Sequence, residues 1–348
     1  TGGEKYNGSE QTVRGYDVSI NNTLYKNTDF AFSGTAEVKG TNAGNYPMGL
    51  KASDFANANT NFTNVKFVVI DGQLDIAKRD VTLTSASDEK VYDGNALTNE
   101  NVTVSGDEFA KGEGATYHVT GSQTDEGTSD NTFTYELNEG TNKDNYNITQ
   151  VPGKLTVKAD ESEVVVTITG NKKSEKYSGE EQTVTDYTVS IDSKTYSEKD
   201  FSFKGTAKAK GTDVGTYPMK LKASDFVNNN KNFKKVTFVV TDGTLEITKR
   251  DVTLTSGSAS RAYNGEALTN DTITVGDDGF VKGEGATYDV TGTITNVGKV
   301  NNEFTYKLKD GTNEKNYNIT TVPGELEVTP VTDEVVVTIK GNTDSKPY

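Results

Sequence analysis

The chain repeats itself without a gap at an offset of 171 residues, so that Glu4 corresponds to Glu175. Residues 4–13 read EKYNGSEQTV, residues 175–184 read EKYSGEEQTV, and the same offset relates Tyr46 to Tyr217. Such regularity is the signature of a repeat array, in which each unit packs mainly against its neighbours. We therefore expect several similar small folds in a row.

Each repeat contains two weakly similar halves. All four halves open with a Tyr-x-Gly motif, at Tyr6, Tyr92, Tyr177 and Tyr263. From this pattern we predict four domains, each near the lower end of the usual domain size. They are domain A1 (residues 1–78), domain B1 (79–159), domain A2 (160–249) and domain B2 (250–330), and residues 331–348 begin a third repeat.

Apolar and polar residues alternate with period two in many short stretches, among them residues 81–84, 133–137 and 187–191. This period is typical of half-buried strands. The best helix candidate, residues 52–55, is one turn long. Short strands between frequent turn signals predict an all-β protein of four tandem antiparallel sandwiches of immunoglobulin-like type, in an elongated array. The alternative is β-grasp-like domains, although the sequence offers no amphipathic helix to cover a sheet.

Two local patterns add detail to this prediction. Asp71-Gly72 and Asp242-Gly243 lie between strand-like runs and predict hairpin turns, because both residue types tolerate positive φ. Pro47 and Pro218 lie in strand-like stretches but lack a backbone donor, so we expect those strands at sheet edges or bulges.

A strand is predicted near the C-terminal end of the chain that has no copy at the N-terminal end. Residues 164–170 (VVVTITG) predict the first strand of domain A2, and a copy (VVVTIKG) runs from Val335 to Gly341. Domain A1 has no such strand before Tyr6, so we expect its sheet to be incomplete. Because an unpaired strand edge is a template for another chain, we hypothesise head-to-tail strand exchange through residues 335–341. Tyr348 would open the next half, as Tyr177 and Tyr6 do.

Composition narrows the possible partners. The formal net charge is −15 and no basic stripe is present, which argues against binding nucleic acid. The longest apolar run, residues 67–70, is far too short to span a bilayer, so we expect no membrane insertion. The chain contains no cysteine. With no leader or sorting signal in the sequence, we interpret it as an internal part of a larger exported protein.

Several motifs resemble the tandem MBG and YDG repeat domains of large surface proteins from Gram-positive gut bacteria. The motifs are residues 90–94 (KVYDG), 111–117 (KGEGATY), 144–149 (DNYNIT) and 214–217 (VGTY). The resemblance covers essentially the whole chain and implies a cell-wall-attached, extracellular parent protein. Asn7, Ser178 and Asn264 replace the aspartate found at Asp93, which puts in doubt any role that needs a carboxylate there.

The sequence offers little for catalysis. His118 is the single histidine, and alternation places it on a polar face. Acidic residues retained at the repeat offset, such as Glu113 and Glu284, are read as solvated charges or turn caps. Asp277-Asp278-Gly279 does not extend into a calcium loop. We expect no catalytic, cofactor or metal site, and hence no enzyme.

The four tyrosines of the Tyr-x-Gly motifs are the candidate binding residues. Each ring, at Tyr6, Tyr92, Tyr177 and Tyr263, either packs in the core or offers a stacking face to a sugar, and we favour the core. We therefore expect a non-catalytic stalk, spacer and adhesin array whose partners are the neighbouring repeats. The alternative is a module that binds a host glycan or host protein with one weak site in each repeat.

Overall fold

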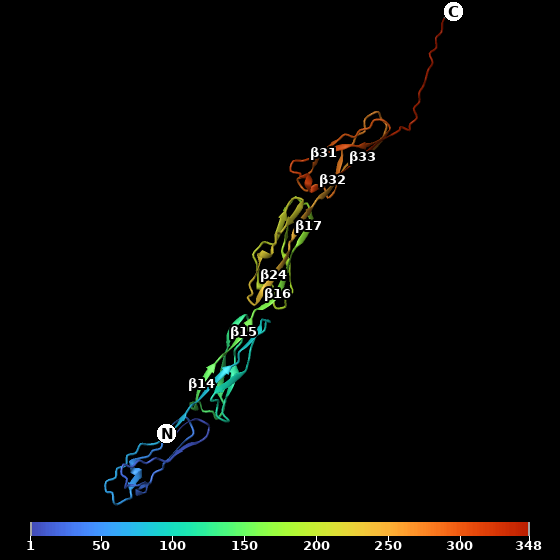
Figure 1. The fold of residues 1–348 in the computed structure, drawn as a ribbon. Helices are drawn as coiled ribbons and strands as arrows, with labels where there is room; N and C mark the ends of the chain where they lie inside the picture. Colours follow the sequence, from blue (N-terminus) through green and yellow to red (C-terminus); the bar gives the residue numbers. More distant parts are fainter. Residues whose placement is uncertain (1, 347–348) are drawn as a thin grey trace. The chain divides into compact units, whose positions relative to one another are not determined.

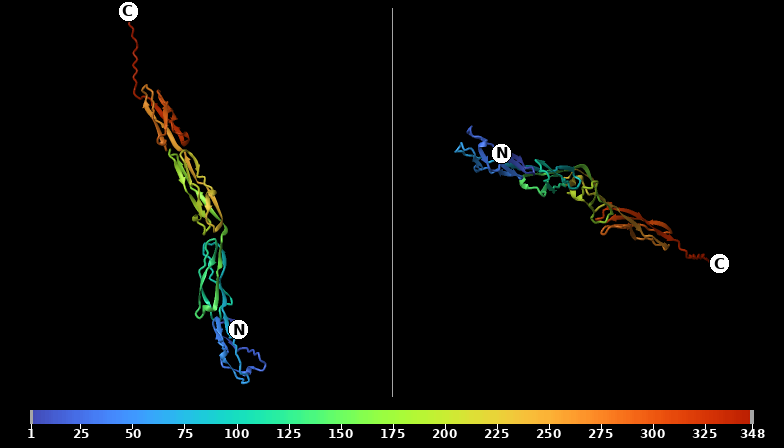
Figure 2. Two further views of the ribbon diagram at one scale, coloured as in Figure 1. Left: turned by 90° about the vertical axis from the view of Figure 1, so that its left-hand side faces the viewer. Right: turned by 90° about the horizontal axis from the view of Figure 1, so that it is seen from below.

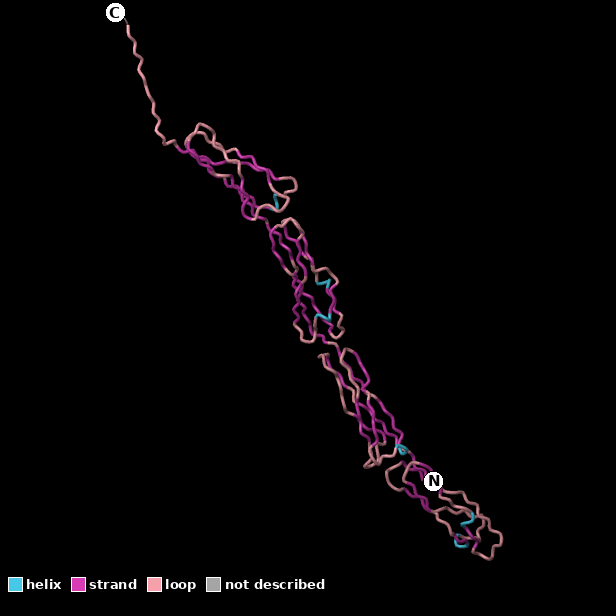
Figure 3. Tube along the Cα trace, turned by 180° about the vertical axis from the view of Figure 1, so that it is seen from behind, coloured by secondary structure: helices cyan, strands magenta, loops and turns pink. Residues whose placement is uncertain are grey.

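The computed structural model describes residues 2–346. It is all-β, with 49% of residues in strands, which confirms the predicted fold class. The helices among the described residues are single 3₁₀ turns of three residues (Figure 3). One of them, η2 (Ala52–Asp54), lies at the predicted single turn. No helix of residues 2–346 is long enough to cover a sheet, which disfavours the β-grasp alternative. The immunoglobulin-like arrangement stays a prediction.

The chain divides into two compact units, and each is described here by itself. Unit 1 consists of Thr1–Ser162 with Asn230–Lys235, and unit 2 of Glu163–Asn229 with Val236–Tyr348. Both are made of short strands that Figure 1 shows without any covering layer of helices.

Unit 1 contains the residues predicted as domains A1 and B1. The A1 strands are β1 (Gly2–Lys5), β2 (Gln11–Arg14), β3 (Phe30–Phe32), β4 (Glu37–Gly40), β5 (Gly44–Pro47), β6 (Phe55–Asn57) and β7 (Gln73–Ala77), with helices η1 (Asn27–Asp29) and η2. The B1 strands are β8 (Arg79–Ser85), β9 (Asp88–Val91), β10 (Val102–Gly106), β11 (Ala115–Val119), β12 (Gly127–Asn131), β13 (Phe133–Leu137), β14 (Tyr146–Val151) and β15 (Gly153–Lys158), with η3 (Lys143–Asn145). The three-stranded sheets have the orders β1-β7-β5, β10-β8-β14 and β12-β15-β9.

The A2 and B2 strands repeat this plan with one additional sheet. The A2 strands are β16 (Asp160–Gly170), β17 (Lys172–Lys176), β18 (Gln182–Thr185), β19 (Tyr187–Ile191), β20 (Phe201–Phe203), β21 (Lys208–Gly211), β22 (Gly215–Pro218), β23 (Phe226–Asn228), β24 (Phe233–Thr241) and β25 (Thr244–Thr248), with η4 (Glu198–Asp200) and η5 (Ala223–Asp225). The B2 strands are β26 (Arg250–Ser256), β27 (Ala259–Ala262), β28 (Ile273–Asp277), β29 (Ala286–Val290), β30 (Gly298–Asn302), β31 (Phe304–Leu308), β32 (Tyr317–Val322) and β33 (Gly324–Thr329), with η6 (Glu314–Asn316). The additional sheet is β19-β16-β24, and the segments of A1 that correspond to β19 and β24 are not strands.

Two of the expectations on local structure are wrong. The sheets are mixed rather than purely antiparallel, because β1 pairs with β7 in parallel and β17 pairs with β25 in parallel. The Asp242-Gly243 dipeptide makes no hairpin, because β24 and β25 belong to different sheets. Instead, the Asp242 carboxylate accepts the backbone N–H groups of Lys220 and Leu221. The chain therefore changes sheets at this turn.

The two prolines lie where the missing donor predicts. Pro47 ends β5 and Pro218 ends β22, and each of these strands is at the edge of its three-stranded sheet. This prediction is confirmed, since an edge strand tolerates a position without a backbone N–H.

Candidate functional site at the junction of the two halves

The backbone brings the two halves of each repeat into direct contact. Only Lys78 separates β7 from β8, and only Lys249 separates β25 from β26. Strand β1 ends beside Lys78 in unit 1, and β17 ends beside Lys249 in unit 2. There the Tyr6 N–H donates to Ala77 O over 2.8 Å, and the Tyr177 N–H donates to Thr248 O over 2.9 Å. A Lys-Tyr pair at the end of β1 in unit 1, and at the end of β17 in unit 2, is thus held against the B half.

The main hydrophobic clusters lie across this junction. In unit 1 the buried cluster combines A1 and B1 residues, namely Tyr6, Leu74, Ile76, Val81, Leu83, Ala110, Phe133 and Tyr146. In unit 2 it combines A2 and B2 residues, namely Tyr177, Val184, Ala209, Met219, Leu221, Leu245, Ile247, Val252, Leu254 and Tyr317. Smaller clusters, such as Leu268 with Leu326 and Val328, lie elsewhere in the B halves. Apolar side chains of both halves are buried in one cluster. Separating the two halves would expose these side chains to water, which is unfavourable.

At the centre of each junction, one carboxylate accepts hydrogen bonds from two buried tyrosines. In unit 2, Tyr177 Oη donates to Glu284 Oε1 over 2.5 Å and Tyr317 Oη donates to Glu284 Oε2 over 2.8 Å. The two rings meet edge to face with centroids 5.6 Å apart, a favourable geometry for aromatic pairs. We call this group the tyrosine clamp of unit 2.

Unit 1 has the same clamp at the repeat offset. Tyr6 donates to Glu113 Oε1, Tyr146 Oη donates to Glu113 Oε2 over 2.8 Å, and the two rings are 5.7 Å apart at 84°. The Ala110 N–H in turn donates to Tyr146 Oη over 2.9 Å. Both hydroxyls are therefore satisfied although their residues are only 4–5% exposed.

Burial and the nearby carboxylate shift the titration of these tyrosines. Burial, followed by the hydrogen bond to Glu284, raises the pKa of Tyr177 to about 12. Burial is also the main cause that raises the pKa of Tyr146 to about 12, with Glu113 adding to it. The cause is the cost of placing a phenolate in an apolar site beside a carboxylate. The clamp thus holds its tyrosines neutral well above their usual range.

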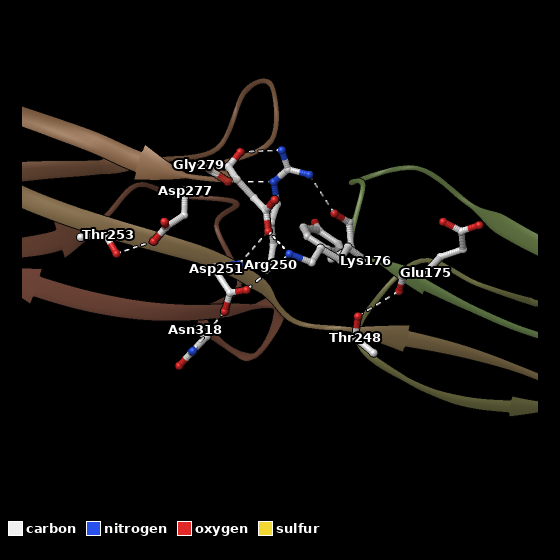
Figure 4. A network of polar contacts seen from close by, with 11 residues as sticks. Glu175, Lys176, Thr248, Arg250, Asp251, Thr253, Asp277, Gly279 and Asn318 are labelled. Atoms are coloured by element: carbon white, nitrogen blue, oxygen red, sulfur yellow. Dashed lines mark hydrogen bonds and ion pairs between the residues drawn. The ribbon is translucent and has the colours of Figure 1, made fainter.

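A polar network lies beside the clamp of unit 2 (Figure 4). The Lys176 Nζ and Asp278 Oδ2 atoms are 2.6 Å apart, and Asp251 Oδ2 is 3.4 Å from the same Nζ. Arg250 donates to the backbone oxygens of Gly279 and Asp278 over 2.8 and 2.6 Å, and to Tyr177 O over 3.4 Å. The guanidinium, with its fixed fork of donors, therefore links the loop after β28 to the end of β17.

The corresponding network of unit 1 differs only in detail. Lys5 Nζ is 2.5 Å from Asp107 Oδ2, and Arg79 donates to Glu108 O over 2.7 Å and to Tyr6 O over 3.2 Å. The hydrogen bond from Lys5, then the backbone N–H of Asp80, lowers the pKa of Asp107. Because these charged side chains are half exposed, we attribute positioning to them rather than a large gain in stability.

A buried asparagine makes the third connection between the halves. Asn316 Oδ1 accepts the Val214 N–H over 2.9 Å, and its amide group donates to Asp213 Oδ1 over 2.7 Å. In unit 1, Asn145 Oδ1 accepts the Ala43 N–H over 2.9 Å. Both asparagines are 0% exposed. Each is the last residue of a 3₁₀ turn in the B half and reaches a loop of the A half, so removal would leave buried polar groups without partners.

The junction of unit 2 also borders a shallow polar depression lined by Lys176, Asp251, Asp277, Asp278, Asn318 and Thr320. Its carboxylates are already engaged, since Asp278 contacts Lys176 and Asp251 accepts from Asn318. Throughout residues 2–346, no group of three or more His, Cys, Asp or Glu side chains is placed to hold a metal ion. The charged groups of the depression are therefore paired with one another, and they do not form a set of convergent acids and bases.

The structure distributes the four candidate tyrosines over different surroundings. Tyr6 and Tyr177 are buried in the clamps, with hydroxyls on carboxylates. Tyr92 is half-buried against the cluster of Leu97, Leu155 and Val157. Tyr263 is 43% exposed, the largest exposed fraction of the four. Binding of a ligand through these residues stays a prediction.

Sequence reasoning did not identify the junction as a site. From the sequence we predict solvated charges or caps for Glu113 and Glu284, and Asn145 is noted only within the DNYNIT motif. In the structure, each of the three contacts the neighbouring half. The available signal was retention at the repeat offset, which these residues share with Lys5, Arg79, Asp107 and Tyr146.

Comparison with known families adds one finding. The MBG domain family model matches residues 164–249. MBG domains occur in surface-associated proteins, and the family is not known to be catalytic. The match begins within β16, so this strand belongs to the domain that the family model describes. No curated protein matches the chain. Among the described residues, no helix is long and apolar enough to cross a bilayer.

Proposed function

We propose that the chain is a non-catalytic stalk and spacer segment, and part of an adhesin array, in a large extracellular protein of a bacterial cell surface. The observation that carries this proposal is the junction, whose clamp, ionic network and buried asparagine recur in both units at the same offset. Contacts retained in this way serve a connection between neighbouring domains, as expected of a repeat array.

The MBG match supports a surface role for the part of the chain that it covers. The resemblance of the other motifs extends the proposal to a cell-wall-attached parent protein in a Gram-positive gut bacterium. A net charge of −15 and the absence of cysteine are compatible with an exposed extracellular segment. In this role the repeats supply reach, and the partners are neighbouring repeats of the same protein.

Small-angle X-ray scattering tests the spacer role. Four domains in line should give a radius of gyration of about 35 Å, whereas one globule of this length should give about 20 Å. A value near the second figure would contradict the proposal. The concentration is kept low, so that self-association does not contribute.

A binding screen separates the spacer from the alternative, a module for a host glycan or protein. Tyr263 is the candidate residue with the most exposed ring. A stacking site there would give glycan-array signals that Tyr263→Ala abolishes, whereas the spacer role predicts no such signal. As a control, Tyr92→Ala alters the corresponding tyrosine of domain B1, whose ring is half-buried.

A further inference from the structure

We propose that each B half is a tension-bearing element, in which a pull on the two ends of the half shears paired strands along their length and does not peel them apart. The first two strands of the half are held in parallel by its last two strands. This inference rests on the proposed spacer role, because a segment that connects two distant points carries the tension between them. It adds a mechanical property that reach alone does not require.

In domain B1 the first two strands pair in parallel with the last two. β8 pairs with β14 over six residue pairs, starting with Arg79 opposite Tyr146. β9 pairs with β15 over four residue pairs, starting with Asp88 opposite Leu155. Since β8 leads into β9 and β14 leads into β15, the entering segment and the leaving segment of the chain lie side by side through two sheets.

The chain enters and leaves B1 at opposite ends of the domain. Figure 2 shows its ribbon, coloured cyan to green, with the start of β8 at one end and the finish of β15 at the other. A pull on these two points draws β8 and β9 in one direction and β14 and β15 in the other. Because the hydrogen bonds of a parallel ladder are evenly spaced along the strands, the load is shared among them and they must break together.

Sliding of these strands would also disturb the core. The side chains of Val81 and Leu83 in β8, and of Leu155 and Val157 in β15, belong to residues that are 0–1% exposed. Buried side chains interdigitate at the density of a crystal, so they cannot pass one another unless the core expands. Apolar packing therefore opposes the same movement that the two ladders oppose.

A buried polar contact fixes the register at the point where both segments change sheets. Ser85 at the end of β8 is 1% exposed, and its Oγ donates to Asn131 O over 2.5 Å and accepts the Gly153 N–H over 2.9 Å. A Cβ on Gly153 would lie 2.4 Å from Ser85 O, so the two backbones touch here. We call this contact the crossing. A slip by one residue would bring the Cβ of Pro152 or Lys154 into it, and no such atom fits.

Domain B2 has the same parts at the repeat offset. β26 pairs with β32 in parallel, and β27 pairs with β33 in parallel. At its crossing, Ser256 Oγ donates to Asn302 O over 2.6 Å and accepts the Gly324 N–H over 2.8 Å. A Cβ on Gly324 would lie 2.4 Å from Ser256 O. A pull along the chain would therefore load the same arrangement in both units.

Optical tweezers test the direction of resistance in the full chain. The chain has no cysteine, so two introduced thiols are the sole attachment points for the handles. Lys78→Cys with Lys158→Cys pulls the two ends of B1 apart and loads the ladders in shear. Lys78→Cys with Lys143→Cys pulls the neighbouring starts of β8 and β14 apart and peels the same ladder. All three lysines are exposed, and the second pair is the matched control because it shares one attachment point with the first.

We expect a several-fold higher unfolding force for the first pair than for the second at the same loading rate. The gain in extension identifies B1, because each residue between the handles contributes about 3.5 Å when extended. Forced unfolding is governed by the unfolding rate, so the two pairs can differ in force although their free energies of unfolding are equal. Equal forces, or a lower force for the first pair, would overturn the tension-bearing role. That result would leave the spacer role, which scattering tests, unaffected.

The crossing is tested by Ser85→Ala in the chain with thiols at positions 78 and 158. Loss of the hydroxyl leaves the Gly153 N–H buried without its acceptor, so the shear force should fall. The control Val119→Ala trims a side chain that packs against the same apolar cluster, but from β11, which pairs with β13 alone. Urea unfolding should show a loss of stability in both variants, whereas the shear force should fall in Ser85→Ala and not in Val119→Ala. An equal fall in both would overturn the proposal that the paired strands carry the load.

Discussion

Tyr177 Oη donates a 2.5 Å hydrogen bond to Glu284 Oε1 across the junction between the A2 and B2 halves, and Tyr6 makes the same bond to Glu113 in the other repeat. Each carboxylate also accepts from a tyrosine of its own half, so one side chain satisfies two buried hydroxyls. The connection between the halves is therefore specific and not merely a matter of apolar burial.

Removal of the central carboxylate should destabilise the unit that contains it. Glu284→Ala leaves the Tyr177 and Tyr317 hydroxyls buried without their acceptor, at a cost of about 1–3 kcal/mol in the free energy of unfolding. Urea unfolding of the full chain measures the loss. The control Glu136→Ala changes an exposed carboxylate on β13 and should have an effect below about 0.5 kcal/mol. Equal effects of the two variants would contradict a structural role of the clamp.

The raised tyrosine pKa values predict a loss of stability in alkali. The pKa of Tyr177 and of Tyr146 is about 12 in the folded chain, against 10.0 for an unperturbed tyrosine. The unfolded chain therefore releases its tyrosine protons first, so the stabilisation is complete below pH 10 and is lost as the pH rises toward 12. Urea unfolding at pH 8 to 11.5 should show a plateau and then a fall. In Tyr177→Phe the free energy of unfolding should fall less steeply with pH. An unchanged slope would exclude the clamp as the cause of the alkaline loss of stability.

The same isoleucine should contribute very differently to the free energy of unfolding at its two positions in the chain. Ile168→Ala removes a side chain that is 0% exposed in β16 and should cost about 2–5 kcal/mol. Its counterpart Ile339→Ala changes a residue that is 89% exposed and should cost almost nothing in the monomer. Both variants are compared by urea unfolding at low concentration. A loss of more than about 1 kcal/mol for Ile339→Ala in the monomer would show that residues 335–341 are packed.

Much of the fold follows from local pattern. The period-two stretches at residues 133–137 and 187–191 become β13 and β19, and both prolines are in edge strands. The parallel pairing of β1 with β7 could not be read from local sequence, because it joins strands about 70 residues apart and no short-range turn specifies it. The hairpin predicted at Asp242-Gly243 is wrong for a related reason: a turn dipeptide specifies the local bend and not the sheet that the next strand joins.

The candidate site was less accessible to sequence reasoning. The Tyr-x-Gly motif pointed to Tyr6 and Tyr177, but not to their acceptors, which lie 107 residues away. Glu113 was one of many acidic residues, and a single sequence does not state which carboxylate meets which hydroxyl. Retention of Tyr, Glu and Asn at one offset was the useful signal, and only the three-dimensional contact explains it.

Hydrogen exchange of the full chain tests the junction most directly. The Val214 and Ala43 N–H groups lie in loops and donate to the buried Asn316 and Asn145 across their junctions. We predict that both amides are protected like those of the sheets. In Asn316→Ala, the Val214 amide should lose this protection while Ala43, in the unaltered repeat, keeps it. Exchange of both amides at the rate of free loops in the wild type, or an unchanged Val214 in the variant, would contradict a fixed junction.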